Sequence, residues 1–391
     1  MKIHHHHHGS RLTRRGLFAS VIPGALLAPG AFPQGVEETA ARFRQRSAEF
    51  EAKGLADPFK GITADGNVET GLYGIHSTGV STEPVRVAVE RFLESLSVEQ
   101  RGRTMFGVES LAEMTDAQRR AAFGVLGAAL SAKGLKLTRD IMRLNETLAE
   151  LTGDHDFLGE WLYHFTVMGK PSAREPWGFQ LDGHHVIINY FVLGDQVVMT
   201  PFFAGSEPVT APSGKYKGVS ILQEEQERGF QMLQGLNRGQ RVKAILNPEK
   251  TKNYNLTEAF KDNVVLDYAG VRGAELAERE KKQLLDLVAL YVGNMDEGHA
   301  RVKMDEVKRH IGRTCFAWVG GEEAGGTFYY RIHSPVILIE FDHQSPANLG
   351  RFAKDPKAPT RQHIHTVVRT PNGNDYGKDL LRQHYLAHAH A

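Results

Sequence analysis

The fold is decided by the stretch Phe328-Tyr329-Tyr330-Arg331-Ile332-His333-Ser334-Pro335-Val336-Ile337-Leu338-Ile339-Glu340-Phe341-Asp342-His343. It predicts two strands, over residues 328–333 and 336–341, because aromatic and β-branched residues recur on both sides of the turn signal Ser334-Pro335. Residues 363–368 have the same character and predict a third strand. The C-terminal third of the chain is therefore expected to be rich in sheet.

Helical patterns precede and interrupt the sheet regions. Residues 36–151 read as helices joined by short polar breaks. Thr115 and Gln118 fit a capping box, in which the threonine side chain accepts the Gln118 amide and the Gln118 side chain reaches back. Other helices are expected over residues 220–236, 274–292 and 378–389.

A second sheet region lies near the middle of the chain. Residues 186–191 and 197–203 read as strands on either side of the turn signal Gly194-Asp195, which predicts a hairpin. The expected fold class is α+β, with a helical N-terminal half and a mixed or antiparallel sheet built mainly from residues 184–203 and 328–368.

Composition limits the classes of function. Of the 391 residues, 41% are hydrophobic and 24% charged, as in an ordinary soluble globular protein. The formal net charge of +1 gives no surface suited to a polyanion, so nucleic acid is not an expected partner. Cys315 is the only cysteine, so any metal ion must be held by His, Asp or Glu. A glycine-rich phosphate loop is missing from its required context, which disfavours nucleotide chemistry.

The N-terminal sequence predicts an export signal. Thr13-Arg14-Arg15-Gly16-Leu17-Phe18 resembles a twin-arginine motif, and it is followed by the apolar run 17–27 and small residues over 28–31. The run is too short for an ordinary membrane span. We expect residues 1–35 to be an export signal and residues 36–391 to be a single α+β domain. The alternative is a basic amphipathic helix.

Export implies a periplasmic or extracellular location, with no stable membrane insertion after signal removal. The twin-arginine route carries folded proteins, which would suit a metal ion acquired in the cytoplasm. The run His4 to His8 is either a purification tag or a natural leader, and it is excluded from site reasoning.

The sharpest chemical signal is His363-Ile364-His365. Alternate strand residues point the same way, so a His-x-His pair can offer two imidazoles to one ion. The alternative interpretation is two surface histidines on a half-exposed strand.

Carboxylates on the preceding strand extend this signal. Alternation places Glu340 and Asp342 on one face, and if that face meets His363 and His365, a site with two histidines and one carboxylate results. Such a set suits zinc, iron or manganese, and addition of His343 or His333 would suit copper as well. The alternative for the carboxylates is a solvated face. The predicted metal ligands are His363, His365, Glu340 and His343.

Four further residues are expected to take part in catalysis. Gly183-His184-His185 opens a strand, so only one of the two histidines can join a given site, and His184 is favoured as fourth ligand or proton carrier. Arg331 and Arg369 can orient a carboxylate-bearing substrate, although pairing with Glu340, Asp342 or Asp375 explains them equally. Asp375 is a possible general acid or base.

These residues lie within blocks that resemble a known family, domain of unknown function 3500. The first two blocks are Pro176-Trp177-Gly178-Phe179-Gln180-Leu181-Asp182-Gly183-His184-His185 and Pro201-Phe202-Phe203-Ala204-Gly205-Ser206-Glu207-Pro208. The others are Phe328 to His333, Ile339 to His343, and His363-Ile364-His365 through Asn374-Asp375-Tyr376-Gly377 to Leu381-Arg382-Gln383-His384-Tyr385. The resemblance implies one family-sized domain and carries no reaction with it. One departure is the small Ala204 before Gly205, where a bulkier residue is expected.

The predicted function is that of an exported metal-dependent enzyme acting on a small polar or acidic molecule. Its cofactor is a divalent transition metal ion, copper, zinc or iron, and copper or iron would make it an oxidoreductase, the favoured reading. Alternatives are a zinc-dependent hydrolase, a metal-free hydrolase that uses Asp375, Glu340 and a histidine, and a non-catalytic binding protein. The oligomeric state is not predicted.

Overall fold

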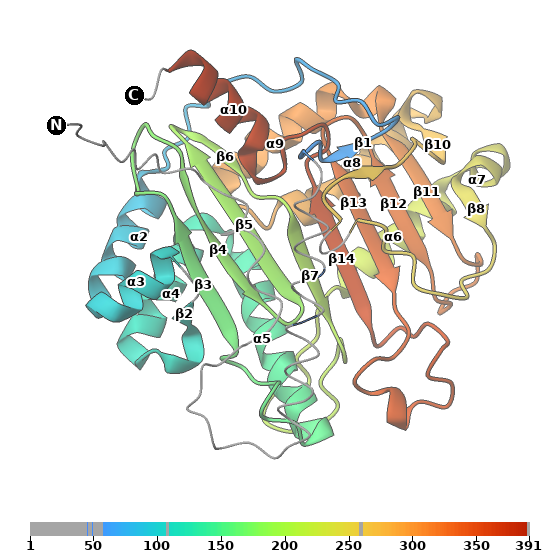
Figure 1. Ribbon diagram of the computed structural model, residues 1–391. Coiled ribbons are helices and arrows are strands. Elements are labelled where there is room, and N and C mark those ends of the chain that lie inside the picture. The colour runs from blue at the N-terminus through green and yellow to red at the C-terminus, as the bar shows by residue number, and fades with distance from the viewer. Residues whose placement is uncertain (1–44, 46–48, 50–57, 107–108, 258–260, 389–391) are drawn as a thin grey trace.

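A mixed sheet of twelve strands forms the centre of the computed structural model, counted over the residues that the structure describes, which are 45, 49, 58–106, 109–257 and 261–388 (Figure 1). Its strands follow in space the order β10 (Val271–Arg272), β11 (Cys315–Val319), β12 (Tyr329–His333), β13 (Leu338–His343), β14 (Ile364–Arg369), β7 (Phe202–Ser206), β5 (Val186–Leu193), β4 (Trp177–Gly183), β3 (Tyr163–Met168) and β2 (Glu109–Ser110). Strand β6 (Gln196–Val198) pairs with β5, and β8 (Ile245–Asn247) pairs in parallel with β11. A separate parallel pair joins β1 (Ile62–Thr63) to β9 (Val264–Val265).

Helices alternate with these strands, which confirms the α+β class. They are α2 (Glu83–Ser95), α3 (Val98–Phe106), α4 (Asp116–Ala129), α5 (Ala132–Thr152), α6 (Gln223–Gly235), α7 (Arg238–Ala244), α8 (Glu278–Val292), α9 (Glu297–Arg309) and α10 (Lys378–Ala387). The predicted capping box is present at the start of α4, where Thr115 and Gln118 exchange their side-chain hydrogen bonds.

The three predicted C-terminal strands are β12, β13 and β14. Strand β13 begins at Leu338, two residues later than expected. The Ser334 hydroxyl accepts hydrogen bonds from the amides of Val336 and Ile337, so these residues form a turn before the strand can pair.

The predicted hairpin around Gly194-Asp195 is also present, as β5 and β6. The second strand does not run on to Phe203 as expected. A new strand, β7, begins at Phe202 and pairs with β5 on one side and β14 on the other. Strand β7 therefore joins the middle and C-terminal sheet regions into one sheet.

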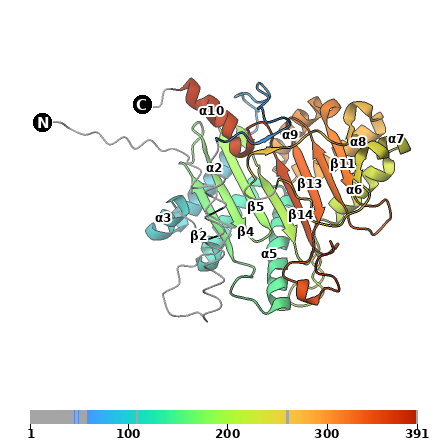
Figure 2. The same ribbon diagram turned by 45° about the vertical axis from the view of Figure 1, so that its right-hand side comes forward.

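One face of the sheet packs against helices. Helices α5 and α6 lie behind the strands in both views (Figures 1 and 2). The Tyr330 hydroxyl donates to the Glu225 carbonyl of α6 at 3.0 Å and lies 2.5 Å from the Tyr291 hydroxyl of α8. The Tyr330 ring stacks on Phe341 at 5.0 Å. Tyr330 is thus fixed between the sheet and two helices.

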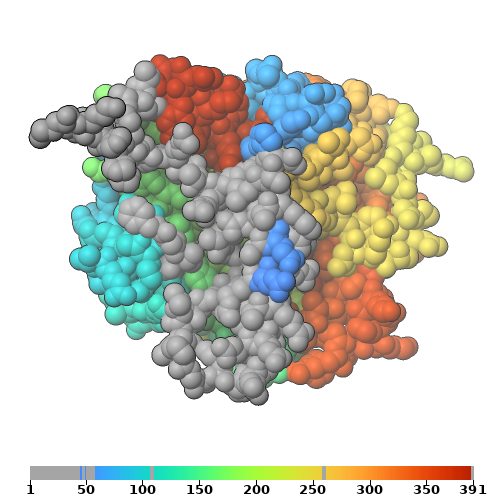
Figure 3. Space-filling view, in the orientation of Figure 1, coloured from blue at the N-terminus to red at the C-terminus, as the bar shows by residue number. Residues whose placement is uncertain are grey.

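The opposite face is covered in part by α10. Leu380 of α10 packs against Phe191 and Leu193 of β5. The Gln383 side chain donates to the Tyr73 carbonyl at 3.1 Å, which ties α10 to the segment after β1. The two lie side by side at the upper edge of the molecule (Figure 3).

Two expectations concern membranes and export. Within the described ranges, every helix is too short or too polar to cross a bilayer. The export signal predicted over residues 1–35 lies outside the described residues.

The close contact between α6 and β12 makes a testable prediction. A Cβ atom at Gly229 of α6 would lie 2.1 Å from the Tyr330 ring, which cannot move because of its two hydroxyl contacts and its stacking. We expect Gly229→Ala to lower the free energy of unfolding by about 1–3 kcal/mol. Urea denaturation measures it.

The matched control is Gly124→Ala in α4, where a Cβ atom meets nothing within 4 Å. Because alanine is the better helix former, this variant should gain about 0.5–1 kcal/mol. The same sign for both substitutions would contradict the packing argument.

Candidate metal centre

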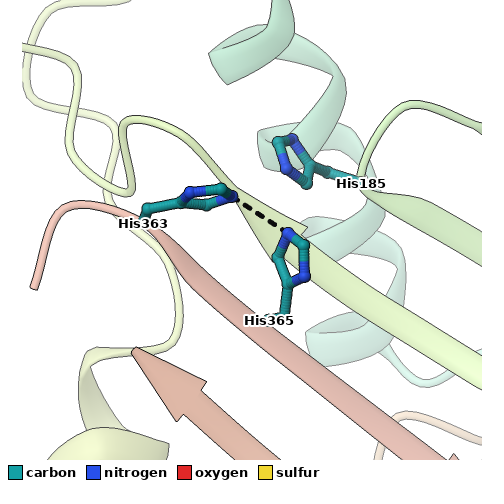
Figure 4. Close-up of side chains that lie close together, drawn as sticks. All are labelled: His185, His363 and His365. Carbon is teal, nitrogen blue, oxygen red and sulfur yellow. Dashed lines mark hydrogen bonds between the residues drawn. The ribbon is translucent and has the colours of Figure 1, made fainter. Parts of the chain in front are cut away.

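Three histidines converge on the sheet face that does not carry α5 and α6. His185 precedes β5, and His363 and His365 lie at the start of β14 (Figure 4). One ring nitrogen of each lies within 4.8 Å of the other two. Of the described His, Cys, Asp and Glu residues, only these three form such a group.

Gly205 of β7 makes this convergence possible. Its amide donates to the His185 carbonyl at 2.8 Å, and the sheet register places it opposite His365. A Cβ atom at Gly205 would lie 3.0 Å from the His365 ring, 3.4 Å from the His185 ring and 2.6 Å from the Ile364 carbonyl. Only glycine leaves room for the two imidazoles to approach each other across β7.

A backbone contact fixes the protonation of His363. Its Nδ1 lies 2.7 Å from the Ser345 carbonyl, and since a carbonyl only accepts, Nδ1 carries the proton. In the neutral ring Nε2 is then the lone-pair atom, and it lies 3.0 Å from Nε2 of His365. Metal-bound histidines are usually held in this way, by a hydrogen bond from the other ring nitrogen.

The spacing and burial of the rings fit metal binding. Two imidazoles bound to a tetrahedral ion at about 2.0–2.1 Å have nitrogens roughly 3.3 Å apart, close to the distance between His363 and His365. Burial lowers the pKa of His363 and of His185 well below the usual range, and neighbouring histidines lower both further. His363 and His185 are therefore neutral near pH 7, the form that binds a metal ion.

His184 lies against this group as a neighbour. Its ring centroid is 3.9 Å from that of His185, and its Nδ1 donates to the Asn145 side-chain oxygen of α5 at 2.7 Å. Burial lowers the pKa of His184 to about 4. The structure thus brings both histidines of the pair to the site, with His185 in the place expected for His184.

His185 takes this place because residues 184 and 185 form a hairpin turn, where the sequence predicted the start of a strand. Strand β4 ends at Gly183 and β5 begins at Val186, so His184 and His185 form the two-residue connection of a hairpin. His185 has a positive φ of 69°, and the Tyr163 hydroxyl donates to the His184 carbonyl at 2.7 Å. Two apolar runs separated by two residues are the signal that could have identified this turn.

The structure does not bring Glu340 to the three histidines. Glu340 and Asp342 share the face of His365, as expected, and Asp342 is the cross-strand partner of His365. Their carboxylates instead bind the chain that crosses this face. Glu340 accepts from the amides of Leu256 and Thr257 at 3.0 and 2.9 Å, and Asp342 from those of Tyr254 and Asn255.

His343 likewise has no free nitrogen for a metal ion. Its Nδ1 accepts from the Phe328 amide at 2.9 Å, and its Nε2 donates to the Gln226 side chain at 2.7 Å. It lies on the helix-covered face, because strand alternation turns it away from Asp342.

The three other predicted catalytic residues are held by protein partners. Arg369 and Asp375 form a buried pair at 2.8 Å, and Asp262 lies 3.2 Å from the same guanidinium. Arg331 donates to the Asp267 carbonyl at 3.2 Å. Arg369 thus contacts Asp375, one of the partners that the sequence left open, whereas Arg331 contacts Asp267, which was not among them.

Fold and geometry define an α+β protein with a group of three histidines, of which His185 and His363 are buried and His365 is partly exposed. The chain belongs to the family described as Protein of unknown function (DUF3500), whose model matches residues 78–378. This agrees with the resemblance seen in the sequence blocks. Neither a curated protein nor a solved structure matches the chain.

The role of Gly205 is testable. Gly205→Ala forces the His185 and His365 rings apart, so we expect affinity for Zn²⁺ or Cu²⁺ to fall by roughly tenfold or more. Titration against a chromophoric chelator measures it. Gly74→Ala, where a Cβ atom meets nothing within 4 Å, is the matched control. Unchanged affinity in a folded Gly205→Ala protein would contradict this role.

The buried Arg369 pair predicts a large loss of stability on truncation. Arg369→Ala leaves Asp375 buried without its partner, which should cost about 3–5 kcal/mol of unfolding free energy. Arg382→Ala breaks an exposed pair with Asp379 and should change it by at most about 1 kcal/mol. Thermal and urea unfolding would compare the two, and equal effects would argue against a structural role for Arg369.

Proposed function

We propose that His185, His363 and His365 bind one transition metal ion and that the protein is an exported metal-dependent enzyme. The observation that carries the proposal is the 3.0 Å approach of the Nε2 atoms of His363 and His365, with the His363 Nε2 left as the acceptor because the Ser345 carbonyl holds the proton on Nδ1. Three protein ligands leave a coordination position for substrate, water or dioxygen.

The ligand set narrows the choice of ion. Imidazole suits copper, zinc and iron, but the two-histidine, one-carboxylate set typical of non-haem iron is not assembled, because Glu340 binds backbone amides. Copper or zinc therefore fits better than iron.

Copper chemistry remains the first candidate. Three imidazole ligands add no negative charge, which disfavours the doubly charged ion and raises the reduction potential of copper. His185, His363 and His365 would hold the copper ion, which would supply redox chemistry for oxidation of a small polar or acidic substrate by dioxygen. The enzyme would be an oxidoreductase.

Zinc hydrolysis is the second candidate, and a specific observation favours it. A set of three histidines with one open position is a ligand set of catalytic zinc, which lowers the pKa of its bound water to about 7. Held by these three histidines, zinc would supply hydrolytic chemistry for a substrate carbonyl or phosphoryl group.

The test is the metal content of protein purified without His4 to His8 and dialysed against a weak chelator. We expect about one copper or zinc ion per chain, since three ligands of a single site converge. Mass spectrometry of the elements measures it. Copper would direct assays to oxidation with dioxygen, and zinc to hydrolysis of esters and amides.

Paired variants make the assignment falsifiable. H363A/H365A should lose nearly all of the metal, whereas H155A/H310A, which removes two histidines outside the group, should retain it. A folded H363A/H365A protein with its full metal content would disprove the site.

A further inference from the structure

A cavity lies on the helical side of the molecule. It has a volume of about 610 Å³ and lies between α4, α5 and the chain before β3. Four arginines line it, Arg119, Arg120, Arg139 and Arg143, against two carboxylates, Asp116 and Glu160. In a chain of formal net charge +1, this is a local excess of positive charge.

The two carboxylates are already engaged. Asp116 accepts from Arg119 at 3.3 Å, and Glu160 accepts from Lys215 at 3.0 Å. Arg120 and Arg139, both exposed, form no ion pair with any residue that the structure describes. Two guanidinium groups therefore face the cavity with their charge uncompensated.

An aromatic ring holds one of these two guanidinium groups, that of Arg139; a second ring holds the neighbouring Arg119, whose donors are bound to the Leu111 and Ala112 carbonyls and to Asp116. Arg139 lies over the Phe123 ring at 4.8 Å, and Arg119 lies over the Trp161 ring at 4.8 Å. Phe123 and Trp161 contact each other edge to face at 6.1 Å. A guanidinium stacked on a ring keeps its in-plane N–H donors free to bind a carboxylate or phosphate bidentately.

We propose that this cavity binds a small organic anion, with Arg120 and Arg139 binding its charged group. The anion carries a carboxylate or phosphate, and its apolar body lies against Phe123 and Met142. The volume suits a small molecule, since ligand sites span about 300–1,000 Å³. The site is separate from the three histidines and does not depend on a metal ion.

The fluorescence of Trp161 can report ligand binding in the cavity. The other tryptophans, Trp177 and Trp318, are fully buried, whereas Trp161 lines the cavity. A ligand here should change the fluorescence of Trp161, and W161F should abolish the change. Benzoate, phenyl phosphate and inorganic phosphate are the probes, and benzamide is the uncharged control.

We expect benzoate or phenyl phosphate to change the fluorescence saturably and benzamide not to. A response to phenyl phosphate and inorganic phosphate alone would assign a phosphate ligand, and a response to benzoate a carboxylate. R120Q/R139Q should weaken binding by roughly tenfold or more, because both bidentate partners are lost. R91Q/R238Q removes the same charge from exposed arginines elsewhere and should leave binding unchanged.

Three results would overturn the proposal. They are binding of benzamide equal to that of benzoate, unchanged binding in R120Q/R139Q, and no response of the native protein to any of the anions. Isothermal titration of W161F with the same probes checks that a lost fluorescence signal reflects the reporter and not the site.

Discussion

The close backbone approach at Gly205 is the constraint on which the candidate centre depends. Strand β7 lies between β5 and β14 and, among the strands that the structure describes, it alone pairs with both of these sheet regions, which are far apart in sequence. At Gly205, near the end of this strand, a side chain would strike both His365 and the Ile364 carbonyl. The absence of one Cβ atom therefore lets the sheet close and also lets the imidazoles meet.

Polar residues on the sheet face next to the centre mostly bind backbone. Glu340 and Asp342 hold amides of residues 254–257, and Arg331 holds the Asp267 carbonyl. Buried charges need such partners, because an unpaired one costs several kcal/mol. Carboxylates and arginines near a histidine pair were therefore expected to bind metal or substrate. In the structure they bind backbone groups and fix loops.

Much of the fold was predictable from local patterns. Alternation identified β12, β13 and β14, and helical spacing with a capping box identified α4. Strand β7 was missed as a separate element, because pairing with β14 is a long-range contact that local propensity does not encode.

The site was predictable only in part. His363-Ile364-His365 could be read as a pair from the two-residue period of a strand. His185 could not be chosen over His184, because the choice depends on a hairpin turn and on a positive φ at His185. The contacts of the Glu340 carboxylate depend on residues 254–257, and no sequence pattern near β13 indicates that this segment lies against it.

The hydrogen bond from His363 to the Ser345 carbonyl has a consequence beyond the ring that it orients. Ser345 lies in the connection between β13 and β14, while His185 lies in the hairpin turn between β4 and β5. An ion held by these histidines would act as a cross-link that spans β7 and reaches into the loop. Metal loading would then tie together chain segments that the sheet alone joins through a single short strand.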